Sequence, residues 1–144
     1  MITVVHRNFA EGDVPREENY VEVALEVATD VAVDLPLVFF SGWGSDASIW
    51  NGLLEEHLTP VQECYFVDAP GFGVNKNVSE IPLEKFLALV DERLPMAYIA
   101  IGWSLGGMLA TQMAGRYPAK VKGLVSLASN ACFVVRDEWP QAMS

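Results

Sequence analysis

The feature that most constrains this chain is a serine set between glycines, in the segment Gly102-Trp-Ser-Leu-Gly106. An apolar run over residues 96–102 precedes it, and a helical pattern over residues 104–117 follows it. A strand that turns directly into a helix leaves little room for side chains, which explains the glycines. We expect a strained backbone at Ser104, with its Oγ exposed at the end of the strand. This spacing predicts a nucleophile, and the alternative interpretation is a tight turn with an ordinary capping serine.

The rest of the chain alternates between strand and helix patterns. Short apolar or alternating runs predict strands, and longer segments with helical spacing lie between them. The predicted strands are residues 1–9, 20–28, 35–40, 61–67, 96–102 and 121–128. The predicted helices are residues 45–58, 82–94 and 104–117. This alternation predicts an α/β fold: one domain over residues 1–144, with a mostly parallel sheet and helices on both faces.

Local signals place several details of these elements. Ser45 or Asp46 is suited to cap the first helix, whose apolar face would hold Ile49, Trp50, Leu53 and Leu54. Pro118 is expected to end the helix that follows the serine. The continuous apolar runs at 35–40 and 121–128 predict strands that are buried on both faces.

Composition excludes several classes of function. A net charge of −10 argues against a nucleic-acid partner and against an anionic membrane surface. No apolar run is long enough to cross a membrane, and the first residues lack a signal-peptide pattern. We therefore expect a cytoplasmic protein, in which Cys64 and Cys132 are small apolar residues without a disulfide. No cluster has metal-ligand spacing and no phosphate-binding lysine motif is present, so we expect neither a metal nor another cofactor.

A second glycine-rich loop, residues 41–46, follows the strand at 35–40. Gly42 and Gly44 would let the backbone of Trp43 approach a substrate. An oxyanion hole needs one N–H from the residue after the nucleophile, here Leu105, and one from such a loop. We therefore assign these two donors to Leu105 and Trp43, and expect the Trp43 indole to wall an acyl pocket. The alternative is a core tryptophan beside a flexible turn.

Four segments together resemble the α/β-hydrolase superfamily: residues 41–50, 67–73, 102–110 and 127–140. Within it, they are most similar to the pimeloyl-acyl-carrier-protein methyl ester esterases of biotin synthesis. The resemblance implies that Ser104 is the nucleophile of a serine carboxylesterase and that Trp43 and Leu105 form the oxyanion hole. It implies hydrolysis of a methyl ester on acyl carrier protein, with release of methanol. The chain departs from the family at Ser41, where a histidine is usual, and at Asn75, where a serine is common.

The chain offers no obvious catalytic base. In this fold the acid and the histidine follow the serine, but the two histidines, His6 and His57, precede it. His6 is predicted on a peripheral strand, and His57 at the far end of a helix. Asp68 resembles a turn residue. Asp137 and Glu138 fall where relatives begin their lid, which we place at residues 130–144. We thus expect a fold truncated before the lid and the last strands, and weak or absent esterase activity.

Other interpretations remain open. A general short-acyl esterase or thioesterase would share this nucleophile region, and a non-catalytic scaffold or interaction fragment would not need a base. Residues 121–128 would form an unpaired apolar edge, which predicts aggregation unless a partner chain covers it. The resemblance places Arg136 where an acyl carrier protein would dock, and the alternative is a surface ion pair with Asp137 or Glu138.

Overall fold

The computed structural model describes residues 1–8, 35–57, 63–130, 132, 134, 137 and 140, except for the side chains of residues 55–57. The strand predicted at 20–28 lies outside these residues. The extent of the domain and the lid predicted at 130–144 stay predictions.

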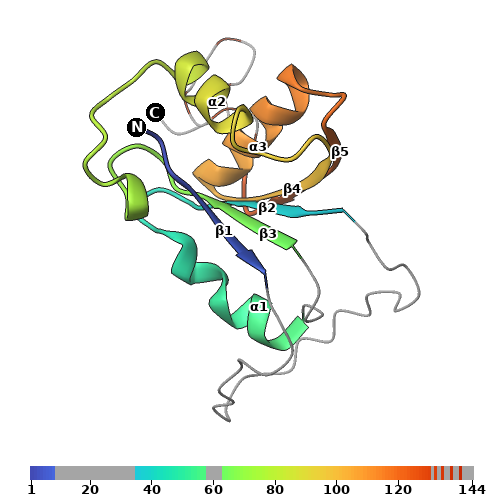
Figure 1. Cartoon of the computed structure of the whole chain (residues 1–144). Helices are drawn as coiled ribbons and strands as arrows, with labels where there is room; N and C mark the ends of the chain where they lie inside the picture. The colour runs from blue at the N-terminus through green and yellow to red at the C-terminus, as the bar shows by residue number, and fades with distance from the viewer. Residues whose placement is uncertain are drawn as a thin grey trace.

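The described strands form one sheet in the order β1-β3-β2-β4-β5 (Figure 1). They are β1 (Val4–Asn8), β2 (Leu37–Phe40), β3 (Glu63–Val67), β4 (Tyr98–Trp103) and β5 (Val121–Leu127). The pairs β2–β3, β2–β4 and β4–β5 are parallel, and only β1 runs antiparallel, beside β3. The mostly parallel sheet predicted from the sequence is therefore confirmed.

Helices cover both faces of this sheet, as predicted (Figure 1). The 3₁₀ helix η1 (Ala47–Trp50) continues into α1 (Asn51–His57) on one face. On the other face lie α2 (Leu83–Asp91) and α3 (Leu105–Arg116). A second 3₁₀ helix, η2 (Gly73–Asn75), follows β3. No helix in the described part of the chain is both long and apolar enough to cross a membrane.

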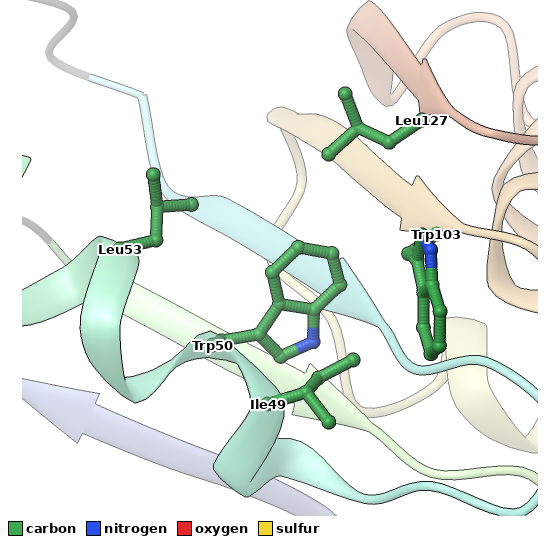
Figure 2. A pocket seen from close by; sticks show the side chains of 5 residues that line it. All are labelled: Ile49, Trp50, Leu53, Trp103 and Leu127. Atoms are coloured by element: carbon green, nitrogen blue, oxygen red, sulfur yellow. The ribbon is translucent and has the colours of Figure 1, made fainter. Parts of the chain in front are cut away.

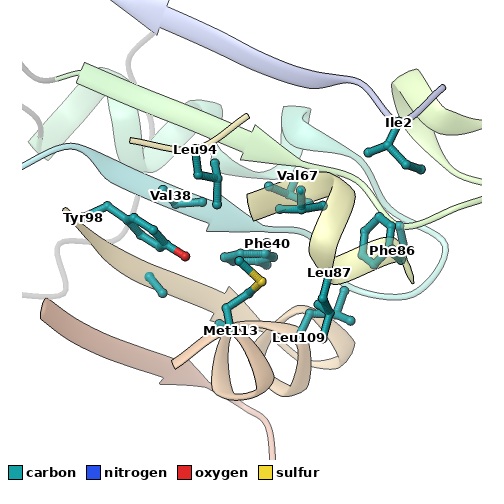
Figure 3. Packing of buried hydrophobic residues seen from close by; sticks show 14 residues of the cluster. Ile2, Val38, Phe40, Val67, Phe86, Leu87, Leu94, Tyr98, Leu109 and Met113 are labelled. Atoms are coloured by element: carbon teal, nitrogen blue, oxygen red, sulfur yellow. The ribbon is translucent and has the colours of Figure 1, made fainter. Parts of the chain in front are cut away.

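The core is split into two clusters by the sheet. On the α2 and α3 face, Phe40 from the central strand β2 packs among buried side chains of both helices, including Leu87 and Met113 (Figure 3). On the α1 face, Phe39 packs on Trp50 and Phe66. Because neighbouring residues of a strand point to opposite faces, the run Leu37–Phe40 serves both clusters and is fully buried, as predicted.

The first helix confirms one detail of the prediction and corrects another. Of the two predicted capping residues, Ser45 and Asp46, the N-cap is Asp46, and its carboxylate accepts a hydrogen bond from the Ser48 N–H at 2.9 Å. Only Trp50 and Leu54 of the predicted apolar face are buried, whereas Ile49 is 42% exposed and Leu53 is half-buried. The reason is that α1 packs beneath β2 and β3 and leaves the sheet next to Ile49 and Leu53 uncovered.

The prediction that the last strand is buried is wrong. No residue of β5 is buried, and Leu124, Val125 and Leu127 are each more than 40% exposed. β5 is the terminal strand of the described sheet, so it has a neighbouring strand, β4, on one side. The predicted apolar sheet edge is thus present in the described structure.

Candidate active site

Ser104 occupies a strained junction between β4 and α3. Its φ of 54° and ψ of −121° lie in a region that residues with a side chain seldom adopt. Such a conformation costs about 1–3 kcal/mol and persists only where the surrounding structure imposes it. Ser104 is the N-cap residue of α3, but its side chain makes no capping hydrogen bond. This is unlike an ordinary capping serine, whose hydroxyl accepts from the first turn.

Glycines make this junction possible through close backbone packing. A Cβ atom on Gly102 would collide with the carbonyl group of Gly106 and lie 2.6 Å from the Gly107 Cα. The strand therefore passes directly under the first turn of α3, as the sequence pattern predicted.

The backbone of Ser104 is held by residues that follow β4 in the chain. Its N–H donates to the carbonyl oxygen of Leu127 at 3.0 Å, at the end of β5. Its carbonyl oxygen accepts from the Ser129 Oγ at 2.6 Å and from the Gly107 N–H at 3.0 Å. Sequence reasoning missed Ser129, because no motif or spacing links it to a serine 25 positions earlier.

Leu105 is the first residue of α3. The first N–H groups of a helix have no acceptor within it, and the helix dipole adds partial positive charge there. This position suits the Leu105 N–H to a developing oxyanion beside Ser104, and its assignment as an oxyanion donor stays a prediction.

The loop Ser41–Asp46 lies next to this junction. β2 and β4 are paired in parallel with Phe40 opposite Gly102, so the segments that follow the two strands are neighbours. A Cβ atom on Gly42 would lie 2.6 Å from the indole of Trp103. The sequence therefore placed the two glycine-rich loops correctly at one edge of the sheet.

A tight turn shapes this loop. Both the N–H and the Oγ of Ser45 donate to the Gly42 carbonyl oxygen, at 3.3 and 2.8 Å. Trp43 lies at the tip of the turn with 74% of its surface exposed, and its ring packs edge to face on Phe72. Its role as the second oxyanion donor remains a prediction.

An apolar pocket of about 420 Å³ opens beside the junction, on the α1 face (Figure 2). Its lining residues come from η1, α1 and the ends of β4 and β5; they are Ile49, Trp50, Leu53, Trp103 and Leu127. Trp43 is not among them. Sequence reasoning did not use Trp103, although strand alternation places it on the same face as Ile99 and Ile101.

Two carboxyl groups concern this part of the fold: Asp46 is the last residue of the loop, and Asp68 directly follows β3. Hydrogen bonds from the side chain and the backbone N–H of Ser48 hold the pKa of Asp46 below its ordinary value. Asp68 is 1% exposed, and burial raises its pKa against the opposing effect of the hydrogen bond that the Val74 N–H donates to its Oδ2 at 3.1 Å. Asp68 is therefore a buried acid that holds the turn at residues 73–75.

His6 does not meet Ser104 in the described structure. His6 lies on β1, where it pairs with Glu63 at 3.0 Å and stacks on Tyr65. Two strands separate β1 from β4, which corresponds to roughly 14 Å at the usual strand spacing. His57 is the last residue of α1, as predicted, and its side chain lies outside the described part.

Other residues named from the sequence fall as follows. Arg136 and Glu138 lie outside the described residues, and Asp137 is an exposed turn residue. Cys64 is buried, Cys132 is half-buried, and no disulfide joins them. Within the described ranges, no group of three or more His, Cys, Asp or Glu side chains could hold a metal ion.

Comparison with known proteins identifies relatives along most of the chain. The chain is 44% identical over 110 residues to the biotin biosynthesis bifunctional protein BioHC of Cellvibrio japonicus. This match covers 75% of the chain and 21% of that protein. The chain is 36% identical over 107 residues to the pimeloyl-[acyl-carrier protein] methyl ester esterase of Yersinia enterocolitica, covering 74% of this chain and 41% of that enzyme. The chain thus spans well under half the length of either relative.

The fold has solved counterparts. An esterase from Exiguobacterium antarcticum superposes with a TM-score of 0.62 at 21% identity, over 76% of this chain and 44% of that structure. At this identity the likeness concerns the fold. The family model for the alpha/beta hydrolase fold matches residues 36–144. Since this match covers most of the chain, the protein belongs to the alpha/beta hydrolase fold family.

Proposed function

We propose that this protein is a serine carboxylesterase with Ser104 as its nucleophile. The observation that carries the proposal is the backbone of Ser104, which is strained, lies at the carboxyl end of β4 and leaves the side chain without a capping hydrogen bond. Ligands of parallel α/β sheets bind at this edge. A hydroxyl kept in such a costly position is better explained by chemistry than by a turn.

In the proposed reaction, the Ser104 Oγ attacks the carbonyl carbon of an ester. A base takes the hydroxyl proton, and the N–H groups of Trp43 and Leu105 stabilise the oxyanion. The tetrahedral intermediate collapses as the carbon–oxygen bond to the alcohol breaks, and the alcohol leaves with a proton. Water then hydrolyses the acyl-enzyme and releases a carboxylic acid.

No catalytic base for Ser104 is identified among the described residues. His6 is tied to Glu63 and Tyr65 on a distant strand, and no other described side chain is a histidine. Without a base, serine is a poor nucleophile at neutral pH, and the oxyanion hole alone supports only residual catalysis. We therefore propose slow turnover for these 144 residues by themselves.

For the substrate, we propose the methyl ester of an acyl group carried on acyl carrier protein. The name of the Yersinia relative, a pimeloyl-[acyl-carrier protein] methyl ester esterase, supports this class. The apolar pocket beside Trp103 and Leu127 offers space for part of an acyl chain. Arg136 is the proposed contact with the acidic carrier.

A general short-acyl esterase is the second candidate. The pocket is open and its lining residues carry no charge, so nothing in it selects one acyl end group over another. Equal rates with the carrier-bound methyl ester and a simple short-chain ester would favour this candidate.

Covalent labelling tests the nucleophile. The chain is treated with a fluorophosphonate and analysed by intact-protein mass spectrometry, beside Ser104→Ala and the control Ser79→Ala, which changes an exposed serine outside both glycine-rich loops. We expect one slow adduct in the parent and in Ser79→Ala, and none in Ser104→Ala. An adduct that forms equally fast in Ser104→Ala would remove Ser104 from the mechanism.

A further inference from the structure

The ring of Trp43 packs on the turn that follows β3, although most of its surface is exposed. Trp43 lies at the tip of the loop Ser41–Asp46, between Gly42 and Gly44. Glycines on both sides leave the backbone there few steric limits, and Gly44 has a φ of 71°. The Trp43 ring nevertheless meets the Phe72 ring edge to face, with 5.3 Å between the two centroids. An aromatic contact of this geometry favours one orientation of the indole.

Phe72 is itself anchored in the fold. It is half-buried and packs against the buried cluster on the α2 and α3 face. Its N–H donates to the Ala69 carbonyl oxygen at 3.1 Å, and its carbonyl oxygen accepts from the Asn75 N–H at 2.8 Å. The backbone of Phe72 is thus bonded on both sides, so its ring offers Trp43 a fixed surface.

The buried side chain of Asn75 ties the turn that carries Phe72 to two strands. Its Nδ2 donates to the carbonyl oxygens of Asp68 at 2.7 Å and Thr3 at 3.1 Å, and its Oδ1 accepts from the Thr3 N–H at 2.8 Å. An amide group has two donor hydrogens and one acceptor oxygen, and each takes part in a bond here. Asp68 directly follows β3 and Thr3 directly precedes β1. The turn is therefore held at the end of one strand and at the start of the other.

The loop meets β3 and its turn at two further places. The Ser41 N–H donates to the Val67 carbonyl oxygen at 3.2 Å, which bonds the first residue of the loop to the last residue of β3. A Cβ atom on Gly73 would lie 2.8 Å from the Asp46 Cβ, so the turn passes directly against the last residue of the loop. Both ends of the loop are thus held from the same side, and Phe72 supports the tip between them.

The tip gains this support where its own hydrogen bonds do not supply it. The turn closes through the N–H and the Oγ of Ser45, which both donate to the Gly42 carbonyl oxygen. Neither bond uses the Trp43 N–H. The orientation of that N–H consequently depends on how the Trp43 side chain is packed.

We propose that Phe72 is a positioning residue, which holds the Trp43 indole and thereby sets the place of the Trp43 N–H. The importance of that N–H for catalysis rests on the proposed function. The packing itself does not, because it follows from the contact between the two rings.

The packing is tested by ¹⁹F NMR of the chain labelled with 5-fluorotryptophan. The chain has four tryptophans, and Trp43→Phe identifies the resonance of Trp43. Phe72→Leu removes the aromatic ring and keeps an apolar side chain. Tyr117→Leu is the matched control, because Tyr117 is also half-buried and packs against the same cluster, at the end of α3 far from Ser104.

In Phe72→Leu we expect the Trp43 resonance to move toward that of free 5-fluorotryptophan, while the resonance of the buried Trp50 stays in place. Tyr117→Leu should leave the Trp43 resonance unchanged, and Phe72→Tyr, which keeps the ring, should restore it. An unchanged Trp43 resonance in Phe72→Leu would overturn the proposal.

The rate of Ser104 labelling tests the N–H. Loss of one aromatic pair corresponds to a factor of roughly two to ten, so Phe72→Leu should be labelled more slowly by about this factor. Phe72→Tyr and Tyr117→Leu should be labelled at the parent rate. A shifted Trp43 resonance with unchanged labelling would overturn the positioning role, because the ring would then move without the N–H.

Two further measurements cover failures elsewhere. If the parent is not labelled, the proposed function fails, and the ¹⁵N–¹H heteronuclear NOE of the Trp43 amide decides: a fall in Phe72→Leu supports the proposal and an unchanged value overturns it. If Phe72→Leu does not fold, the parent decides. NOEs between the Phe72 ring and the Trp43 indole would support the proposal, and their absence would overturn it.

Discussion

Gly106 of α3 lies directly against the carbonyl group of Phe40 on β2, so close that a Cβ atom at Gly106 would collide with it. This contact sets how closely the first turn of α3 approaches the sheet, and hence the position of Ser104 and Leu105. Since Phe40 is fully buried among both helices of that face, neither partner can move away freely.

Gly106→Ala should therefore destabilise the protein by about 2 kcal/mol or more, because overpacking against backbone forces α3 off the sheet. Gly115→Ala, in the same helix with no atom within 4 Å of the added methyl group, should be neutral or stabilising. Urea unfolding of both variants measures the difference. Equal stabilities would show that α3 does not need this close approach.

Relieving the strain at Ser104 should stabilise the fold. Glycine adopts positive φ without steric cost, so Ser104→Gly should raise the free energy of unfolding by about 1 kcal/mol, whereas Ser104→Ala keeps the strain. Both variants should lose covalent labelling. Ser79→Gly serves as the control, because Ser79 is not among the positive-φ residues. A Ser104→Gly variant no more stable than Ser104→Ala would mean that the junction is not strained.

Gly42→Val should disrupt the loop that carries Trp43. A Cβ atom added at this position would lie 2.6 Å from the Trp103 indole, so the larger valine side chain would displace that ring. We expect Ser104 labelling to slow at least tenfold, as removal of an oxyanion donor does. Gly52→Ala, with open space around the added methyl group, should label at the parent rate. Unchanged labelling of Gly42→Val would count against the assignment of Trp43.

The stability of the protein should depend on pH through Asp68. Burial raises its folded-state pKa above 3.8, so the folded state binds this proton more tightly than the unfolded state. The resulting stabilisation is complete below pH 3.8 and is lost as pH rises through the higher folded-state pKa. Asp68→Asn should remove this fall in the free energy of unfolding.

Urea unfolding over a pH series measures this effect, and Asp46→Asn provides a contrast of opposite sign. The pKa of Asp46 is lowered, so its contribution is present above pH 3.8 and is lost as pH falls through its folded-state pKa. Identical pH profiles for the parent and Asp68→Asn would contradict a raised pKa at Asp68.

Substitution of the exposed β5 strand should reduce self-association. Val125 and Leu127 are exposed on the terminal described strand, and a charge there opposes edge-to-edge pairing. We expect Val125→Lys to lower the light scattering of concentrated solutions, while Val74→Lys, at an exposed site outside the strand, should not. Equal scattering would argue against β5 as the surface that a partner chain covers.

The sequence predicted the described strands and the meeting of the two glycine-rich loops at one edge of the sheet. Strand β2 was recognisable because a strand buried on both faces needs a continuous apolar run. The Ser104 junction was recognisable because its glycines are required by backbone contacts close in the chain, between Gly102 and Gly106. The exposure of β5 could not be read from the same kind of apolar run, since burial depends on what lies against the strand.

By itself, the sequence determined the order of the elements, the strained turn at Ser104 and the glycines that permit it. These depend on local backbone geometry and on periodicity, which short stretches of sequence encode. Only the tertiary structure decided that Ser129 holds the Ser104 carbonyl group, that Trp103 lies over Gly42, and that Asp68 accepts a hydrogen bond from the Val74 N–H. Those contacts join separate loops, and their geometry is set when the sheet brings the carboxyl ends of its strands together.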